Sequence, residues 1–126
     1  MAEDKAISIK TFRAGGERME TETVCRHYDK NGAEHVFFET DGDRCRISFD
    51  EKEMTYRRRG ELTYELCLES GKRTTATLIT AYGRTELACT TYSYELLKTK
   101  DAININIKYN MADEDREMEI RIKERK

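Results

Sequence analysis

Arg58 is the residue of this chain best suited to hold a bound molecule. If the stretch Met54–Leu68 forms one continuous strand, Tyr56, Arg58 and Tyr64 share the face that also carries its leucines. Alternate residues of a strand lie on one face, so these three side chains are expected to point inward. A buried guanidinium needs an acceptor or a counter-charge. One interpretation of Arg58 is therefore an anion site for a ligand carboxylate or phosphate.

Two other interpretations of Arg58 stay open. The arginine can have a structural role at one end of the fold, bonded to carbonyl groups or to Tyr56 and Tyr109, as buried arginines commonly are. Alternatively, Gly60 can form a bulge that shifts the phase and turns Arg57 and Arg59 inward. The candidate ligand-binding residues of the interior are Tyr56, Arg58, Tyr64, Thr91 and Tyr109, with Leu62, Leu66 and Ile105 as apolar inward neighbours.

A basic cluster at Arg57–Arg59 and the basic end of the chain raise the possibility of nucleic-acid binding. Successive residues of a strand point to opposite faces, so the three arginines do not form one patch. The formal net charge is -2, which gives the whole molecule no attraction to phosphate backbones or acidic membranes. We therefore expect no specific nucleic-acid binding and no membrane partner.

The sequence contains no recognisable metal site or catalytic motif. His27 and His35 flank a predicted hairpin turn, where a surface position is expected. The cysteines, spaced by 20, 22 and 22 residues, do not form the close pairs of a zinc site; they are Cys25, Cys45, Cys67 and Cys89. No serine or cysteine lies in a nucleophile-elbow sequence, and the acidic pairs fall on expected outer faces. We expect no metal, no cofactor and no enzymatic activity.

Alternation of apolar and polar residues predicts about ten strands. The expected strands are Ala6–Arg13, Met19–Tyr28, Glu34–Thr40, Arg44–Asp50, Met54–Arg59, Leu62–Leu68, Thr74–Leu78, Arg84–Leu97, Ala102–Met111 and Glu117–Arg125. Asn31-Gly32 and Asp41-Gly42 predict tight hairpins, because both central residues of a type I′ turn need positive φ. The last segment could also form a helix, but the spacing of Met118, Ile120 and Ile122 favours a strand.

The chain of 126 residues has the length of a single domain, residues 1–126, with residues 1–5 expected to be disordered. The opening residues do not resemble a signal peptide, and no apolar run reaches membrane-spanning length. We therefore expect a cytoplasmic protein with reduced cysteines. Because no helix is expected between the strands, neighbours should pair antiparallel, and closure into a barrel would remove exposed edges. A two-sheet sandwich is the alternative.

Several short motifs resemble the YwiB-like family of small uncharacterised bacterial proteins. They are Arg58-x-Gly60, Thr80-x-Tyr82-Gly83, Glu86-Leu87, Thr91 and the Ile107-Lys108-Tyr109 strand. The resemblance covers Arg44–Lys126 best, and it is looser over the first 40 residues. It implies a calycin-like, that is lipocalin-like, β-barrel. The family carries no assigned activity, so only fold analogy connects it with ligand binding.

Three functions follow from this interpretation. The first is a non-enzymatic barrel that binds a small, partly apolar or anionic ligand in its interior. The second is an interaction or regulatory module with a filled barrel, whose protein partner binds the charged outer face. The third, a nucleic-acid-associated protein, would use Arg57, Arg59 and the basic tail. A connected interior cavity of about 300 Å³ or more would favour the first function, and a packed interior the second. The sequence indicates neither the ligand nor the oligomeric state.

Overall fold

The computed structural model describes residues 3–124, which form ten β-strands and no helix. The strands are β1 (Glu3–Arg13), β2 (Arg18–Lys30), β3 (Ala33–Thr40), β4 (Asp43–Phe49), β5 (Glu53–Arg59), β6 (Thr63–Glu69), β7 (Arg73–Thr80), β8 (Gly83–Lys98), β9 (Ala102–Met111) and β10 (Glu114–Glu124). Each strand pairs antiparallel with the next in sequence, and β1 pairs with β10 to close a barrel. The predicted all-β meander barrel is confirmed. None of these residues forms a helix that could cross a membrane.

The tight turns form where the sequence places them. Asn31 and Gly32 both have positive φ, of 56° and 81°, between β2 and β3. Asp41 and Gly42 repeat this geometry between β3 and β4, with φ of 52° and 82°. These are the backbone conformations that a type I′ hairpin requires.

Both ends of the chain are strands. β10 pairs with β9 and β1, and its Met118, Ile120 and Ile122 are buried, so the strand interpretation is confirmed over the helix. The prediction of disorder for residues 1–5 is wrong for residues 3–5, which belong to β1. Lys5 pairs with residues of both neighbouring strands, which explains the order. Met1 and Ala2 lie outside the described residues.

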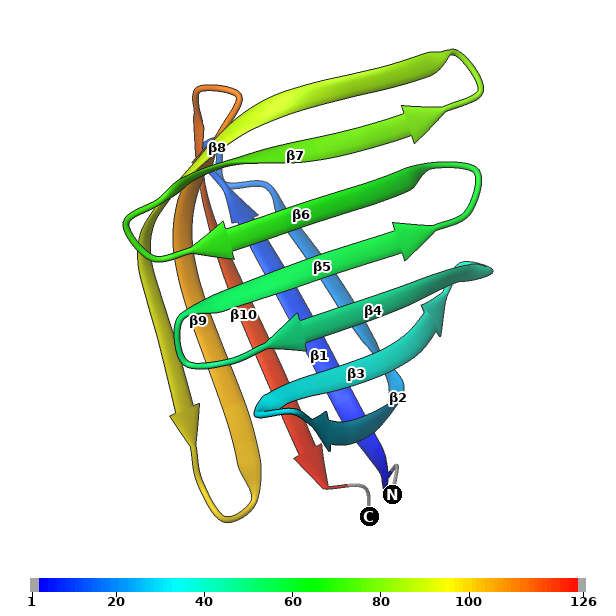
Figure 1. Ribbon diagram of the computed structural model, residues 1–126, viewed down its shortest axis with the longest axis vertical. Helices are drawn as coiled ribbons and strands as arrows, with labels where there is room; N and C mark the ends of the chain where they lie inside the picture. Colours follow the sequence, from blue (N-terminus) through cyan, green and yellow to red (C-terminus); the bar gives the residue numbers. More distant parts are fainter. Residues whose placement is uncertain (1–2, 125–126) are drawn as a thin grey trace.

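The barrel is flattened into two layers that cross steeply. In Figure 1, β3 to β7 run across the view, whereas β1, β9 and β10 run along the long axis behind them. β8 belongs to both layers because its register shifts between Thr91 and Ser93. Its first half pairs with β7, and its second half pairs with β9.

Side chains from all ten strands fill the space between the layers. The core comprises Ile7, Ile9, Cys25, Val36, Phe38, Cys45, Ile47, Phe49, Met54, Leu66, Leu68, Ala76, Cys89, Ile103, Ile105, Ile107, Tyr109, Met111, Met118, Ile120 and Ile122. None of them is more than 8% exposed. Ten strands in a round barrel would enclose a wider space; the flattening brings facing side chains into contact.

Met54–Leu68 forms two strands, as the strand list predicted, and not the single continuous strand on which the phase of Arg58 was argued. β5 ends at Arg59 and β6 begins at Thr63, so Leu62 lies in the turn, 38% exposed, and does not point inward. Arg58 pairs with Tyr64 across this turn. The interruption keeps even-numbered residues of both strands on the inner face, so the phase predicted for Arg58 and Tyr64 is nevertheless correct.

Candidate functional site

Arg58 points inward and bonds to an acid, and it also interacts with Tyr56, as one structural interpretation expected. Its Nε donates to Oδ2 of Asp43 at 2.7 Å, and both side chains are partly buried. This hydrogen bond raises the pKa of Arg58. Asp43 begins β4, and the β4–β5 register, in which Arg44 lies opposite Arg59, brings it within reach.

Gly60 makes room for this ion pair and does not form a bulge. A β-carbon at residue 60 would lie 1.8 Å from Oδ1 of Asp43, a distance that no side chain could keep. The register shift of the barrel lies in β8 instead, between Thr91 and Ser93. The alternative in which Arg57 and Arg59 turn inward is therefore wrong.

The other four predicted site residues lie in one region of the interior. The rings of Tyr56 and Tyr64 are 6.0 Å apart, and Tyr109 contributes to the raised pKa of Tyr64. Thr91 lies beside Tyr109 on the neighbouring strand. Burial raises the pKa of all three tyrosines, so they are neutral hydrogen-bond donors.

Two tyrosine hydroxyl groups of this region donate to sulfur atoms, and one threonine hydroxyl is unpaired. Tyr56 donates to Sγ of Cys45 at 3.7 Å, and Tyr64 donates to Sδ of Met111 at 3.6 Å. Oγ1 of Thr91 has no hydrogen-bond partner although the residue is 1% exposed. Sulfur is a poor acceptor, so the hydroxyls retain hydrogen-bonding capacity.

A second arginine cluster, which the sequence did not predict, adjoins this region. Arg13 donates to both carboxylate oxygens of Glu114 at 2.8 Å, and Arg116 donates to one of them at 3.2 Å. The Arg13 hydrogen bond lowers the pKa of Glu114 to about 2. Nε of Arg116 is buried without a partner. This cluster was missed from the sequence because the last strand was expected to start at Glu117, whereas β10 begins at Glu114.

His27 forms a third polar cluster near the β8–β9 turn, and its predicted surface position is wrong. Its Nε2 lies 3.0 Å from Oε1 of Glu34, and both residues are less than 9% exposed. Nζ of Lys98 lies 2.5 Å from the other oxygen of Glu34. Ligand atoms of Asp29, His27 and Glu34 lie within 4.8 Å of one another. The ammonium group of Lys98, however, already supplies the positive charge that a metal ion would bring.

His35 lies on the opposite face of the β-sheet, next to a serine. Its Nδ1 is 2.8 Å from Oγ of Ser48, and Nη2 of Arg46 lies 3.3 Å from the same nitrogen. Burial, with Arg46 next, lowers the pKa of His35. A histidine beside a fixed cation is a weak base. His35 is therefore poorly suited to accept the hydroxyl proton of Ser48 and activate the serine as a nucleophile.

The cysteines are suited to packing rather than to chemistry. All four are free thiols, and Cys25, Cys45 and Cys89 are buried. Burial raises the pKa of Cys25 to about 11. A thiol with such a pKa carries little thiolate at neutral pH and is a poor nucleophile.

The hollows that we describe for residues 3–124 open on the outside or at an end of the barrel. The largest, of about 1020 Å³, runs along the second half of β8. Another, of about 370 Å³, crosses the outer face of β1, β10 and β9, and of the predicted site residues only Tyr109 touches it. Neither hollow is lined by Tyr56, Arg58 or Tyr64. The predicted ligand-binding residues therefore lie together, and apart from Tyr109 none of them lines a described hollow.

These features define an all-β protein with a calycin-like barrel. Residues 7–122 match the family described as a domain of unknown function, DUF1934, and the chain belongs to this family. It is similar to the crystal structure of the ywiB protein from Bacillus subtilis, with a TM-score of 0.87 and 20% identity over 99% of this chain and 94% of that chain. At this identity the likeness shows the fold alone. No curated protein matches the chain.

Proposed function

We propose that this protein is a non-catalytic binding module whose filled barrel acts as a scaffold, and that its partner is a protein bound on the outer face. The observation that carries the proposal is the packed interior. Leu66, Ile105 and Ile107 are completely buried between the two layers, and the described hollows lie elsewhere. A ligand site of ordinary size needs a preformed concave space of about 300 Å³ or more.

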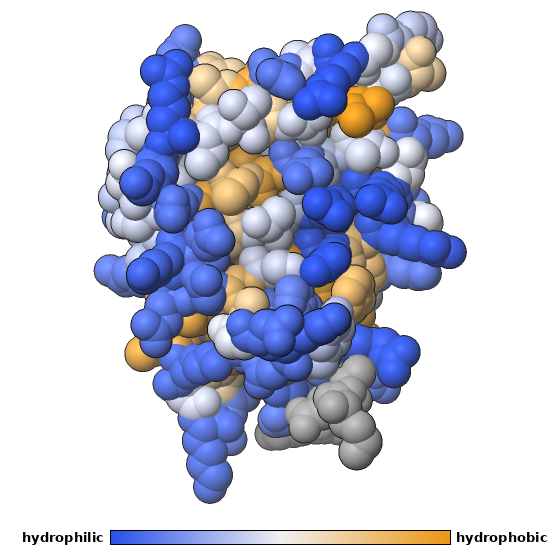
Figure 2. All heavy atoms as spheres, in the orientation of Figure 1, coloured by the Kyte–Doolittle hydropathy of each residue, from blue (hydrophilic) through white to orange (hydrophobic). Residues whose placement is uncertain are grey.

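The outer face supports the same proposal. The face of the molecule drawn in Figure 2 is mostly hydrophilic, with hydrophobic side chains in separate areas. A surface of this kind suits a partner recognised by charge and by backbone hydrogen bonds rather than by a broad apolar patch. The weakly basic His35 and the inert thiols offer no reaction that would favour an enzyme.

Native mass spectrometry of the protein purified from its own cells tests this function. A filled barrel predicts the mass of the bare chain, alone or in complex with another protein, and no retained small molecule. A small molecule bound in stoichiometric amount, and lost in Tyr64→Ala but not in the surface variant Tyr82→Ala, would overturn the proposal.

An interior anionic ligand is the second candidate, favoured by one observation. Oγ1 of Thr91 and Nε of Arg116 are both buried without a partner, and their strands flank the strand of Tyr109. Such atoms can await a ligand or bind water. The same mass spectra distinguish the two candidates. A bound anionic ligand would appear as an adduct of defined mass, whereas bound water would not.

A further inference from the structure

Within residues 3–124, no strand covers one edge of the second half of β8. From Ser93 to Lys98, β8 pairs with β9 alone. Just before this segment, the backbone of Thr91 is bonded to the β6–β7 turn, through Gly71 and Lys72. The uncovered edge therefore begins after the bulge and ends at the β8–β9 turn.

The hairpin geometry identifies the backbone groups on that edge. The amide of Thr99 donates to the carbonyl of Ala102 at 2.8 Å, which makes these residues the hydrogen-bonded pair that closes the hairpin. In an antiparallel pair the bonded positions alternate. The N–H and C=O groups of Tyr94, Leu96 and Lys98 therefore point away from β9.

These groups face the largest of the hollows described for residues 3–124. The groove of about 1020 Å³ has Tyr94–Lys98 on one side. Its other side is formed by the β2–β3 turn at Gly32 and the β4–β5 turn at residues 50–52. The hydroxyl of Tyr94 donates to the carbonyl of Asp50 at 2.7 Å and joins the two sides. A segment of about five residues in extended form would match the length of this edge.

The groove is acidic. Lys98 is paired with Glu34, which leaves the carboxylates of Asp50, Glu51 and Glu95 against the single ammonium of Lys52. Leu97, which is 61% exposed, adds an apolar contact beside the edge. The complementary occupant is a basic segment with apolar residues at alternate positions.

A second copy of the chain is a poorer occupant. Two copies that met through this edge would form an isologous interface, so that each acidic groove would face the other. Like charges placed together oppose such an interface.

We propose that the β8 groove binds an extended, basic segment of a partner protein, which adds to the sheet as a strand next to Tyr94–Lys98. The inference rests on the proposed function, since it names the surface and the partner chemistry of the same binding module. Strand addition takes its affinity from backbone hydrogen bonds and its specificity from alternate side chains.

The test uses a synthetic peptide of alternating lysine and valine, seven residues long, with both ends blocked. We expect saturable binding at low salt that shifts the amide NMR signals of Tyr94, Leu96 and Lys98. The same peptide with alternate amides N-methylated keeps its charge but cannot form a ladder, and we expect it not to bind.

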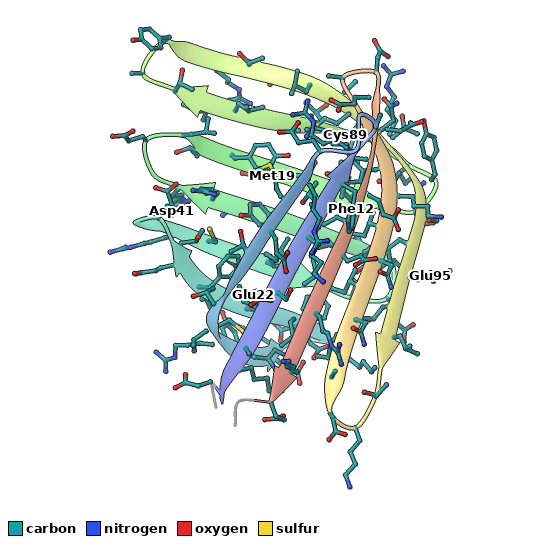
Figure 3. All side chains as sticks on the ribbon, turned by 180° about the vertical axis from the view of Figure 1, so that it is seen from behind. Phe12, Met19, Glu22, Asp41, Cys89 and Glu95 are labelled. Atoms are coloured by element: carbon teal, nitrogen blue, oxygen red, sulfur yellow. The ribbon has the colours of Figure 1, made fainter. Side chains whose placement is uncertain are left out.

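Glu95→Lys and Glu22→Lys form a matched pair of charge reversals. Figure 3 places Glu95 on β8 at the right-hand side of the view and Glu22 on β2 near its middle, and both side chains are exposed. Glu95→Lys should lower the affinity for the lysine–valine peptide by about fivefold or more. Glu22→Lys should lower this affinity by less than about twofold. Equal losses of affinity in the two variants, or peptide-induced NMR shifts at another surface, would overturn the inference. A dimer of the native protein that Glu95→Lys dissociates, as measured by sedimentation equilibrium, would also overturn it. None of these outcomes would restore an interior ligand, so they leave the proposed function intact.

Discussion

The Arg58–Asp43 ion pair depends on a missing side chain. Glycine at position 60 leaves the space that the carboxylate of Asp43 occupies. The sequence could place Arg58 on the inner face, because the alternation of its strand survives the turn. It could not supply Asp43, since the pairing depends on the β4–β5 register and not on any spacing within one strand.

Arg58→Met should destabilise the fold, because it leaves the partly buried carboxylate of Asp43 without its partner. We expect a loss of about 1–3 kcal/mol in the free energy of unfolding. Arg59→Met changes an exposed side chain and should cost less than about 0.5 kcal/mol. Urea unfolding of both variants measures the difference, and equal small losses would contradict the role given to the ion pair.

Gly60→Ala should act through the same ion pair. The new methyl group displaces the Asp43 carboxylate, at a cost of about 1–2 kcal/mol. In the Arg58→Met background the same substitution should cost much less, because the bond is already lost. Gly15→Ala is the control, since no atom lies near its β-carbon. Additive effects in the double-mutant cycle would refute this coupling.

Glu114 gives the fold a pH dependence with a defined sign. Its pKa is about 2 in the folded protein, below its ordinary value of about 4.3. Its stabilising contribution is therefore fully present above the ordinary pKa and is lost as the pH falls toward 2. The stability difference between the native chain and Glu114→Gln should shrink over this range. Thermal unfolding between pH 6 and pH 2.5 measures it, and a constant difference would disprove the assignment.

At the scale of the elements, the strands were predictable because their signal is local. Alternation of apolar and polar residues indicates the strands. Asn31-Gly32 indicates a turn because a type I′ turn needs positive φ at both residues. The second half of β8 was not predictable as an uncovered edge. Its exposure follows from where β7 ends and from the bulge at Thr91, and both are set by pairing between distant segments.

Gly32→Ala should destabilise the β2–β3 hairpin without any steric contact. Residue 32 has a φ of 81°, and no atom lies within 4 Å of the position that a β-carbon would take, so only backbone strain opposes alanine. A cost of roughly 1–2 kcal/mol is expected, and hydrogen exchange of β2 and β3 amides should quicken before that of β9. Gly15 lacks this backbone conformation, so Gly15→Ala should leave both the stability and the exchange rates unchanged.

At the scale of the whole molecule, the sequence predicted a closed barrel but not whether it was hollow. Alternation specifies which side chains point inward; it does not specify how far apart the two walls lie. The crossing of the layers in Figure 1 sets that distance and brings Leu66 and Ile105 into one core. The predicted site residues are therefore neighbours, as expected, but they pack against one another.

A crystal structure of the native protein under xenon pressure tests the filled interior most directly. Xenon enters apolar cavities and marks their position. We expect no xenon between the two layers in the native protein and a single site in Leu66→Ala, where a cavity has been made. A row of xenon atoms between Tyr64, Ile105 and Tyr109 in the native protein would instead show that the barrel is hollow.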